Sequence, residues 1–150
     1  MRLTDRDKAI LSAVSRYRFL ATSHVLSLVP GSRQNIVRRL QCLYHAGFLD
    51  RPRAQLPLRY AGELSEFVYS PTRTTLSHLA AKAEETSSRR EYKSVSSLFL
   101  AHALSISDAL IRLEADCRSR GTAFISERDI IEARRQLPAL HALAAASPLT

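Results

Sequence analysis

Side chains that form hydrogen bonds and ion pairs are concentrated between Arg33 and Arg59. Six arginines and one acidic residue, Asp50, lie in this stretch, so it carries +5 of the chain's formal net charge of +8. Arginine neutralises phosphate groups and gives affinity for any duplex sequence. It also forms paired hydrogen bonds with guanine, while asparagine and glutamine form them with adenine. These residue types therefore indicate contact with double-stranded DNA.

The first half of this stretch fits a helix with two different faces. Apolar residues at three- and four-residue spacing form one face: Ile36, Val37, Leu40, Leu43 and Tyr44. The other face carries Gln34, Asn35, Arg38, Cys42 and His45, with Arg39 at the flank. A helix of this kind enters the major groove. We expect DNA contacts from Arg33, Gln34, Asn35, Arg38 and Arg39 of this helix, and from Arg51, Arg53 and Arg59 beyond it. The alternative is an ordinary solvated face, which the concentration of charge disfavours.

The elements around this helix predict a winged helix-turn-helix. Thr4 and Asp7 have the spacing of a capping box for a helix that ends near Arg18. A short helix capped by Thr22 or Ser23 follows, and the DNA-contacting helix ends at Gly47. Two strands, "GFLDRPR" and "EFVYS", are joined by a loop, "AQLPLRYAGELS", and a further helix covers about residues 72–85. The expected fold is mainly α with a small β-wing, over residues 1–86.

A second region, residues 94–137, is expected to follow the linker "TSSRR". It consists of a long helix over about residues 94–119 and a short α/β extension, with a strand at "TAFIS" and a helix at "ERDIIEARRQL". Residues 138–150 are expected to be a flexible tail. An apolar stripe on the long helix predicts a homodimer interface of Leu98, Phe99, His102, Ile106, Leu110 and Leu113. The alternative is that this stripe packs on the chain's own winged helix.

The acidic residues of the C-terminal region do not indicate an enzyme. Glu127, Asp129 and Glu132 lie close together, but arginines alternate with them and no lysine follows Lys93, so the usual nuclease arrangement of two acids and a lysine is missing. The histidines and tyrosines are scattered, and four glycines form no phosphate-binding loop. Cys42 and His45 are too few ligands for zinc. We expect no catalytic activity, no metal and no cofactor.

The composition indicates the compartment and the type of partner. The chain has 19 arginines and three lysines, a ratio typical of a GC-rich genome, but the net charge itself favours an anionic partner. Two cysteines within expected helices indicate free thiols in a reducing compartment. The N-terminus has no apolar signal segment, and no apolar run reaches the roughly 20 residues of a membrane span. We expect a cytoplasmic protein that does not contact membranes.

Four segments resemble the replication-relaxation family of winged-helix proteins from bacterial plasmids and other mobile elements. They are "LTDRDKAILSAVSRYRFLATSHVLSLV", "RRLQCLYHAGFLDR", "FVYSPTRTTLSHLA" and "HALSISDALIRLEA", within residues 3–116. The sequence departs from the family pattern at Thr74, where members often have glycine. The resemblance implies a winged-helix fold and a role in plasmid replication or in DNA relaxation and transfer.

Three functions are compatible with these observations. The first is a sequence-specific DNA-binding accessory or regulatory factor of a mobile element. The second is a dimeric winged-helix transcriptional repressor. The third is an adaptor that docks a replication or transfer enzyme through protein contacts. Binding to DNA should weaken steeply with salt, whereas docking through an apolar surface should not.

Overall fold

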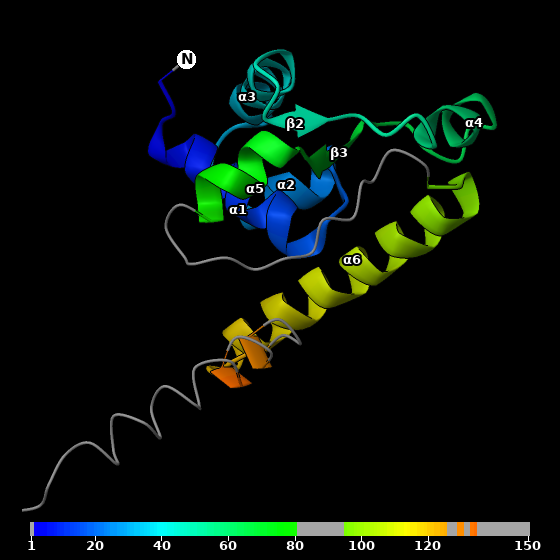
Figure 1. Ribbon diagram of the computed structural model, residues 1–150. Coiled ribbons are helices and arrows are strands. Elements are labelled where there is room, and N and C mark those ends of the chain that lie inside the picture. The colour runs from blue at the N-terminus through cyan, green and yellow to red at the C-terminus, as the bar shows by residue number, and fades with distance from the viewer. Residues whose placement is uncertain (1, 81–94, 126–128, 131–132, 135–150) are drawn as a thin grey trace, which may run out of the picture. The chain divides into compact units, whose positions relative to one another are not determined.

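A computed structural model describes residues 2–80, 95–125, 129–130 and 133–134 (Figure 1). The chain forms two compact units, residues 1–112 and 113–150. The first unit is mainly helical, with a three-stranded antiparallel sheet and a long final helix, in the layout of a winged helix. The predicted boundary between residues 86 and 94 differs from this division, because most of the long helix belongs to the first unit.

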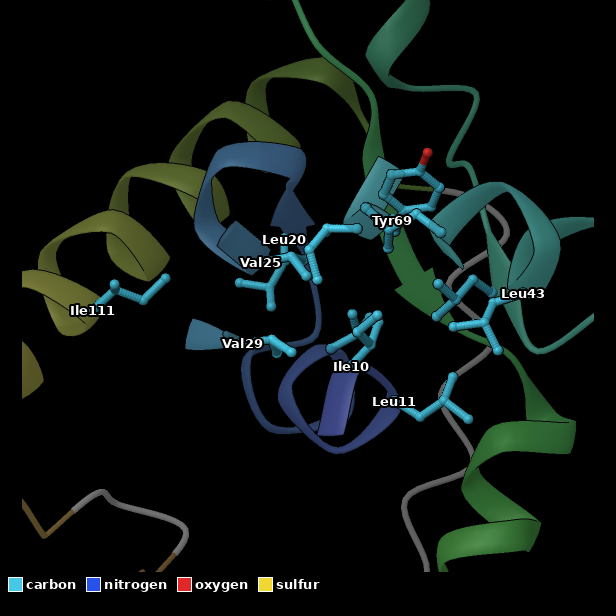
Figure 2. Packing of buried hydrophobic residues seen from close by; sticks show 12 residues of the cluster. Ile10, Leu11, Leu20, Val25, Val29, Leu43, Tyr69 and Ile111 are labelled. Carbon is cyan, nitrogen blue, oxygen red and sulfur yellow. The ribbon is translucent and has the colours of Figure 1, made fainter. Parts of the chain in front are cut away.

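Three helices supply most of the principal core: α1 (Asp5–Tyr17), α2 (Thr22–Leu28) and α3 (Arg33–His45). Figure 2 shows their apolar side chains meeting between the helices and the sheet. The fully buried members of these helices are Ile10, Leu11, Val14, Val25, Ile36, Leu40 and Leu43. Their three- and four-residue spacing is the pattern that predicted the helices, so this part of the prediction is confirmed.

Both ends of this three-helix region are closed by local hydrogen bonds. The predicted capping box is present at α1, where the Thr4 N–H donates to the Asp7 carboxylate (2.7 Å) and the Asp7 N–H donates to the Thr4 hydroxyl (3.3 Å). At the end of α3, Gly47 has a φ of +76°. The Gly47 N–H donates to the Tyr44 carbonyl and the Phe48 N–H donates to the Leu43 carbonyl, which is a Schellman motif. Gly47 therefore ends α3 as its position predicted.

The cap of α2 differs from the prediction. The N-cap is Ala21, whose N–H donates to Nδ1 of His24 (3.3 Å), rather than Thr22 or Ser23. Ser23 instead donates from its backbone N–H (2.9 Å) and from its hydroxyl to the Glu66 carboxylate. A carboxylate at the start of a helix also interacts favourably with the helix dipole. Glu66, which lies just before the last strand and 43 residues after Ser23, therefore caps the start of α2.

The sheet has the order β1–β3–β2, with β1 at Leu20–Ala21, β2 at Leu49–Asp50 and β3 at Val68–Pro71. Leu20 pairs with Tyr69 in one ladder, and Leu49 pairs with Pro71 in the other. The sequence predicted the last two strands, although β2 is shorter than "GFLDRPR". It did not predict β1, because two residues between two helices show no strand periodicity.

The connection between β2 and β3 contains a helix, α4 (Gln55–Tyr60), where the sequence predicted a loop. Pro57 lies in the first turn of α4, where the backbone N–H groups have no partner within the helix, so proline does not interrupt it. Gln55 is buried, and its amide bonds both backbone groups of Val68: Oε1 accepts from the N–H (3.0 Å) and Nε2 donates to the carbonyl (3.3 Å). The Gln55 side chain thus forms the two backbone hydrogen bonds that a neighbouring strand would otherwise form with Val68.

Two further helices follow β3. α5 (Arg73–Ala80) begins after Thr72, whose hydroxyl donates to the carbonyls of Gly47 and Phe48. The predicted end of this helix near residue 85 and the predicted linker lie outside the described residues. The long helix, α6 (Ser97–Ser119), lies within the predicted range 94–119, and Ser96 accepts from the Phe99 N–H at its start (3.2 Å).

One face of α6 is part of the first unit's interior. Leu100, Ser107 and Ile111 are buried, and the Ser107 hydroxyl donates to the Phe19 carbonyl (3.0 Å). Leu100 belongs to a second apolar cluster with Phe19, Ala21 and Val68, against which Leu58, Leu64, Val95, Ala103 and Leu104 pack. The part of α6 before Leu113 therefore supports α4 as well as the principal core.

The second unit, residues 113–150, contains the end of α6. Ion pairs between Arg118 and Glu114 and between Arg120 and Asp116 lie along this end. The predicted strand at "TAFIS" is wrong for residues 122–125, which have no regular secondary structure. Residues 129–130 and 133–134 are helical; the rest of the predicted last helix and the tail at 138–150 lie outside the described residues. Within the described residues, no helix combines the length and apolar character needed to cross a membrane.

Candidate nucleic-acid interface

The outward face of α3 presents four of the predicted DNA-contacting side chains. Arg33, Gln34, Asn35 and Arg38 are all exposed. They occupy the N-terminal half of the helix, where Ser32 is the N-cap and its hydroxyl accepts from the Asn35 backbone N–H (3.4 Å). No side-chain hydrogen bond or ion pair joins these four residues to others in the described part of the chain. Their donors and acceptors are therefore available to base edges and phosphates.

Arg39 has a different environment from Arg38. Its Nε donates to Asp7 Oδ1 (2.7 Å) and one terminal nitrogen donates to Asp7 Oδ2 (2.6 Å), so both carboxylate oxygens are engaged. The Asp7 side chain is fully buried and that of Arg39 is about a quarter exposed, at 26%. Burial alone would raise the pKa of Asp7, but the hydrogen bonds from Arg39 and Thr4 outweigh it and lower the pKa.

This ion pair changes the role that we assign to Arg39. Its hydrogen bonds to Asp7 also raise the pKa of the Arg39 guanidinium, which stays charged. The edge of the guanidinium formed by Nε and one terminal nitrogen is therefore occupied by a buried carboxylate and cannot form a paired contact with guanine. Arg39 therefore fixes α3 against the start of α1, and its contact with DNA stays a prediction.

The wing arginines are also divided between exposed and partnered positions. Arg51 lies over three aromatic rings, with its central carbon 4.4 Å from the ring centre of Tyr44, 4.1 Å from that of Phe67 and 5.2 Å from that of Tyr69. It also donates to the Tyr69 hydroxyl (3.1 Å). Arg59 lies 4.3 Å from the centre of the Phe67 ring. These cation–π contacts hold two arginines at the base of the wing.

Arg53 is the exposed arginine of the wing. It precedes α4, whereas Arg51 and Arg59 are half-buried around Phe67. The side chains available for an external partner are thus Arg33, Gln34, Asn35, Arg38 and Arg53. The remaining three predicted residues, Arg39, Arg51 and Arg59, form contacts that hold α3 and the wing in place.

The sequence did not identify the aromatic residues around Arg51. Phe67 and Tyr69 are two positions apart in an extended segment, so they lie on the same face. The alternation of Phe67 and Tyr69 along one extended segment is therefore the sequence feature that could have indicated an aromatic cluster. The His45 ring contacts that of Tyr44 (5.3 Å between centres). Within the residues that the structure describes, no three metal-binding side chains cluster.

The predicted dimer residues lie outside the fully buried positions of α6, and one of them, Leu113, belongs to the second unit. The exposed fractions are 82% for Leu98, 49% for Phe99, 47% for Ile106 and 49% for Leu113, while His102 is exposed and Leu110 is half-buried. Phe99 also meets Phe19 edge to face, with 6.3 Å between ring centres. Within the first unit, α6 thus buries one apolar face in the core and leaves a second one accessible.

Comparison with known proteins gives the family of the chain. No curated protein and no solved structure matches it. The family model described as replication-relaxation matches residues 11–133, which include α2 to α6 and most of α1. This match supports a role in the replication or relaxation of plasmid or mobile-element DNA. The chain belongs to the replication-relaxation family.

Proposed function

We propose that this protein binds double-stranded DNA with sequence preference, as an accessory or regulatory factor in replication or relaxation. One observation carries the proposal: Gln34, Asn35 and Arg38 are exposed and unpaired within the described part of the chain, on one face of α3. These three residue types form paired hydrogen bonds to base edges in the major groove. The surrounding arginines supply the contacts to phosphate.

The rigidity of α3 supports this proposal. The Arg39–Asp7 ion pair holds the middle of α3, the apolar residues beneath it pack in the core, and the Schellman motif at Gly47 closes its C-terminal end. A recognition helix that is fixed before binding loses little conformational entropy on the DNA. The side chains on the outward face of α3 therefore start from fixed positions when they meet the base pairs.

The experiment is selection of bound sequences from a random duplex pool, followed by salt titration of selected and unselected duplexes. We expect an enriched motif and binding that weakens with salt for both duplexes, because phosphate contacts release counterions. Enrichment without salt dependence would contradict the assigned role of the arginines. Salt-dependent binding without any enriched motif would contradict sequence preference. An absence of DNA binding would favour the adaptor function.

We also propose that the exposed face of α6 joins two copies of the chain. Leu98 and Ile106 are too exposed for ordinary core residues, and contiguous apolar surface is uncommon on a soluble monomer. A dimer would place two recognition helices on one duplex, as in many helix-turn-helix proteins. A replication or transfer enzyme is the other partner that this face would suit, and measurement of the mass in solution distinguishes a dimer from a free monomer.

A further inference from the structure

The first turn of α1 places an arginine beside the start of α3. A methyl group added to Gly31, in the turn between α2 and α3, would lie 3.5 Å from Nε of Arg6 and 3.4 Å from Cδ1 of Ile36. Gly31 has a φ of +152°, which residues with a side chain rarely adopt. Arg6 thus passes beside a position without a side chain, two residues before the exposed Arg33.

The backbone around Arg6 is fixed relative to α3. The next residue, Asp7, closes the capping box with Thr4 and accepts two hydrogen bonds from Arg39 (2.7 and 2.6 Å). Asp7 therefore holds the first turn of α1 against the middle of α3, while Arg6 reaches the turn before its first residue. The position of Arg6 relative to the outward face of α3 is thus set by the same ion pair that orients that helix.

Arg6 has no acidic partner of its own. It is exposed, and within the described part of the chain no side-chain hydrogen bond or ion pair engages it. The two acidic residues beside it already have cations, since Asp5 pairs with Lys8 (2.9 Å) and Asp7 with α3. Residues 31–39 contain three arginines and no acidic residue. The charge at this end of α3 therefore favours an anion.

Arg6 and the exposed wing arginine, Arg53, belong to elements on different sides of α3. Arg53 lies just before α4, and in Figure 1 the start of α1 and α4 lie to opposite sides of α3. A helix in the major groove has a sugar–phosphate backbone on each side of it. Two cations that flank the helix can therefore each reach one of these two backbones.

We propose that Arg6 binds a phosphate of duplex DNA at the edge of the groove that α3 enters, across the groove from the phosphate bound by Arg53. This inference rests on the proposed function and adds a DNA-contacting residue outside the stretch 33–59. Arginine can donate two parallel hydrogen bonds to one phosphate. Phosphate contacts on both sides of α3 fix its orientation on the duplex, and with it the register of Gln34 and Asn35 on the bases.

The test measures how the loss of single phosphate charges changes the binding of the full-length protein. The selected duplex is prepared with one neutral methylphosphonate at a time, and each duplex is titrated in a gel. For the wild type, we expect weaker binding when the substitution lies on either side of the base pairs that α3 contacts. Arg6→Ala should become insensitive to one of these phosphates, and Arg53→Ala to one on the other side. Arg6→Ala should also reduce the salt slope by about one unit.

Two matched variants separate the outcomes. Arg6→Lys keeps the charge and should stay sensitive to the same phosphate, since lysine also binds phosphate. Arg112→Ala removes an equal charge from α6, where Arg112 pairs with Asp108 (2.9 Å), and should keep the wild-type pattern and salt slope. If Arg6→Ala keeps the wild-type pattern of sensitive phosphates, whatever its affinity, the contact is overturned and the proposed function stands. An absence of wild-type binding to any duplex would overturn both.

Discussion

The Arg39 guanidinium donates two hydrogen bonds to the buried carboxylate of Asp7, across 32 positions of sequence. Asp7 also closes the capping box of α1, so one carboxylate connects the start of α1 to the middle of α3. Arg38, the neighbouring residue, is exposed on the outward face of α3, about 100° around the helix from Arg39. Two adjacent arginines thus have separate roles, one within the fold and one at its surface.

We predict that Arg39→Ala lowers the free energy of unfolding by about 3 kcal/mol, because it leaves a buried carboxylate without its partner. Urea denaturation of the wild type and the variant measures this difference. The matched control is Arg38→Ala, which should stay within about 0.5 kcal/mol of the wild type. Equal stability of all three proteins would show that the ion pair contributes nothing to the fold.

We predict that Arg38→Ala reduces discrimination between a selected and a random duplex by about 1–3 kcal/mol, if Arg38 forms a paired contact with guanine. Competition binding of the two duplexes at fixed salt gives this quantity. A variant that binds both duplexes more weakly by the same factor would place Arg38 on phosphate. Gln34→Ala, one turn earlier on the same face, provides a second test of base contact.

We predict that Arg53→Ala weakens binding to all duplexes by a similar factor and reduces the salt slope by about one unit, as expected for a phosphate contact. Arg51→Ala should act differently, because Arg51 lies among Tyr44, Phe67 and Tyr69. Its removal should lower stability in urea through the loss of these ring contacts. If both variants changed only the salt slope, the two arginines would have the same role after all.

We predict that the stability of the wild type falls as the pH decreases below about 6.5, in part because of His24. Burial lowers the pKa of His24 in the folded protein, although Asp108 and Glu66 oppose this effect and Arg112 adds to it. The unfolded chain therefore binds the proton more readily, and folding loses stability between the unfolded and folded pKa values. His24→Asn keeps an acceptor for the Ala21 N–H and should remove this part of the pH dependence.

Urea titrations on either side of this interval measure the effect of His24. The control is His45→Asn, at an exposed position of α3, which should keep the decline seen in the wild type. A decline of the same size in the His24 variant would assign the pH dependence to other groups.

We predict that the full chain sediments as a dimer at micromolar concentration and that Leu98→Ser with Ile106→Ser makes it a monomer. Both residues lie on the exposed face of α6, so the substitutions should leave the fold intact. Truncation before α6 would not be a clean test, since it removes the buried Leu100 and Ile111. A wild type that sediments with the mass of one chain would exclude self-association at that concentration.

The helices of the first unit could be predicted because their signals are local. The capping box needs only Thr4 and Asp7, and the buried residues of α1 and α3 repeat at helical spacing. Gly47 likewise ends α3 through bonds to residues of the same turn. The exposed face that carries Gln34, Asn35 and Arg38 follows from the same periodicity.

The predictions failed where long-range contacts decide the structure. Neither the Arg39–Asp7 pair nor the bonds between Gln55 and Val68 have a local pattern, since their partners lie 32 and 13 positions apart. The sequence predicts a loop at α4 because Pro57, Gly62 and polar residues are typical of loops. Proline is tolerated there because the first turn of a helix needs no N–H donor at that position. The long helix has two apolar faces, one with Leu100 and Ile111 and one with Leu98 and Ile106. The periodicity alone does not indicate which of them packs on the core.

The hydrogen bonds of the Gln55 side-chain amide make the attachment of α4 to β3 measurable by hydrogen exchange. The N–H of Val68 is held by this side chain rather than by a neighbouring strand. Its exchange with deuterated solvent therefore reports the separation of α4 from β3, while buried amides within α1 report unfolding of the whole unit. If the Val68 amide exchanges faster than those in α1, the wing detaches on its own while the helical core stays closed. The wing would then have a lifetime of its own, set by the Gln55–Val68 hydrogen bonds and by the packing of Leu58 and Leu64 on the second apolar cluster.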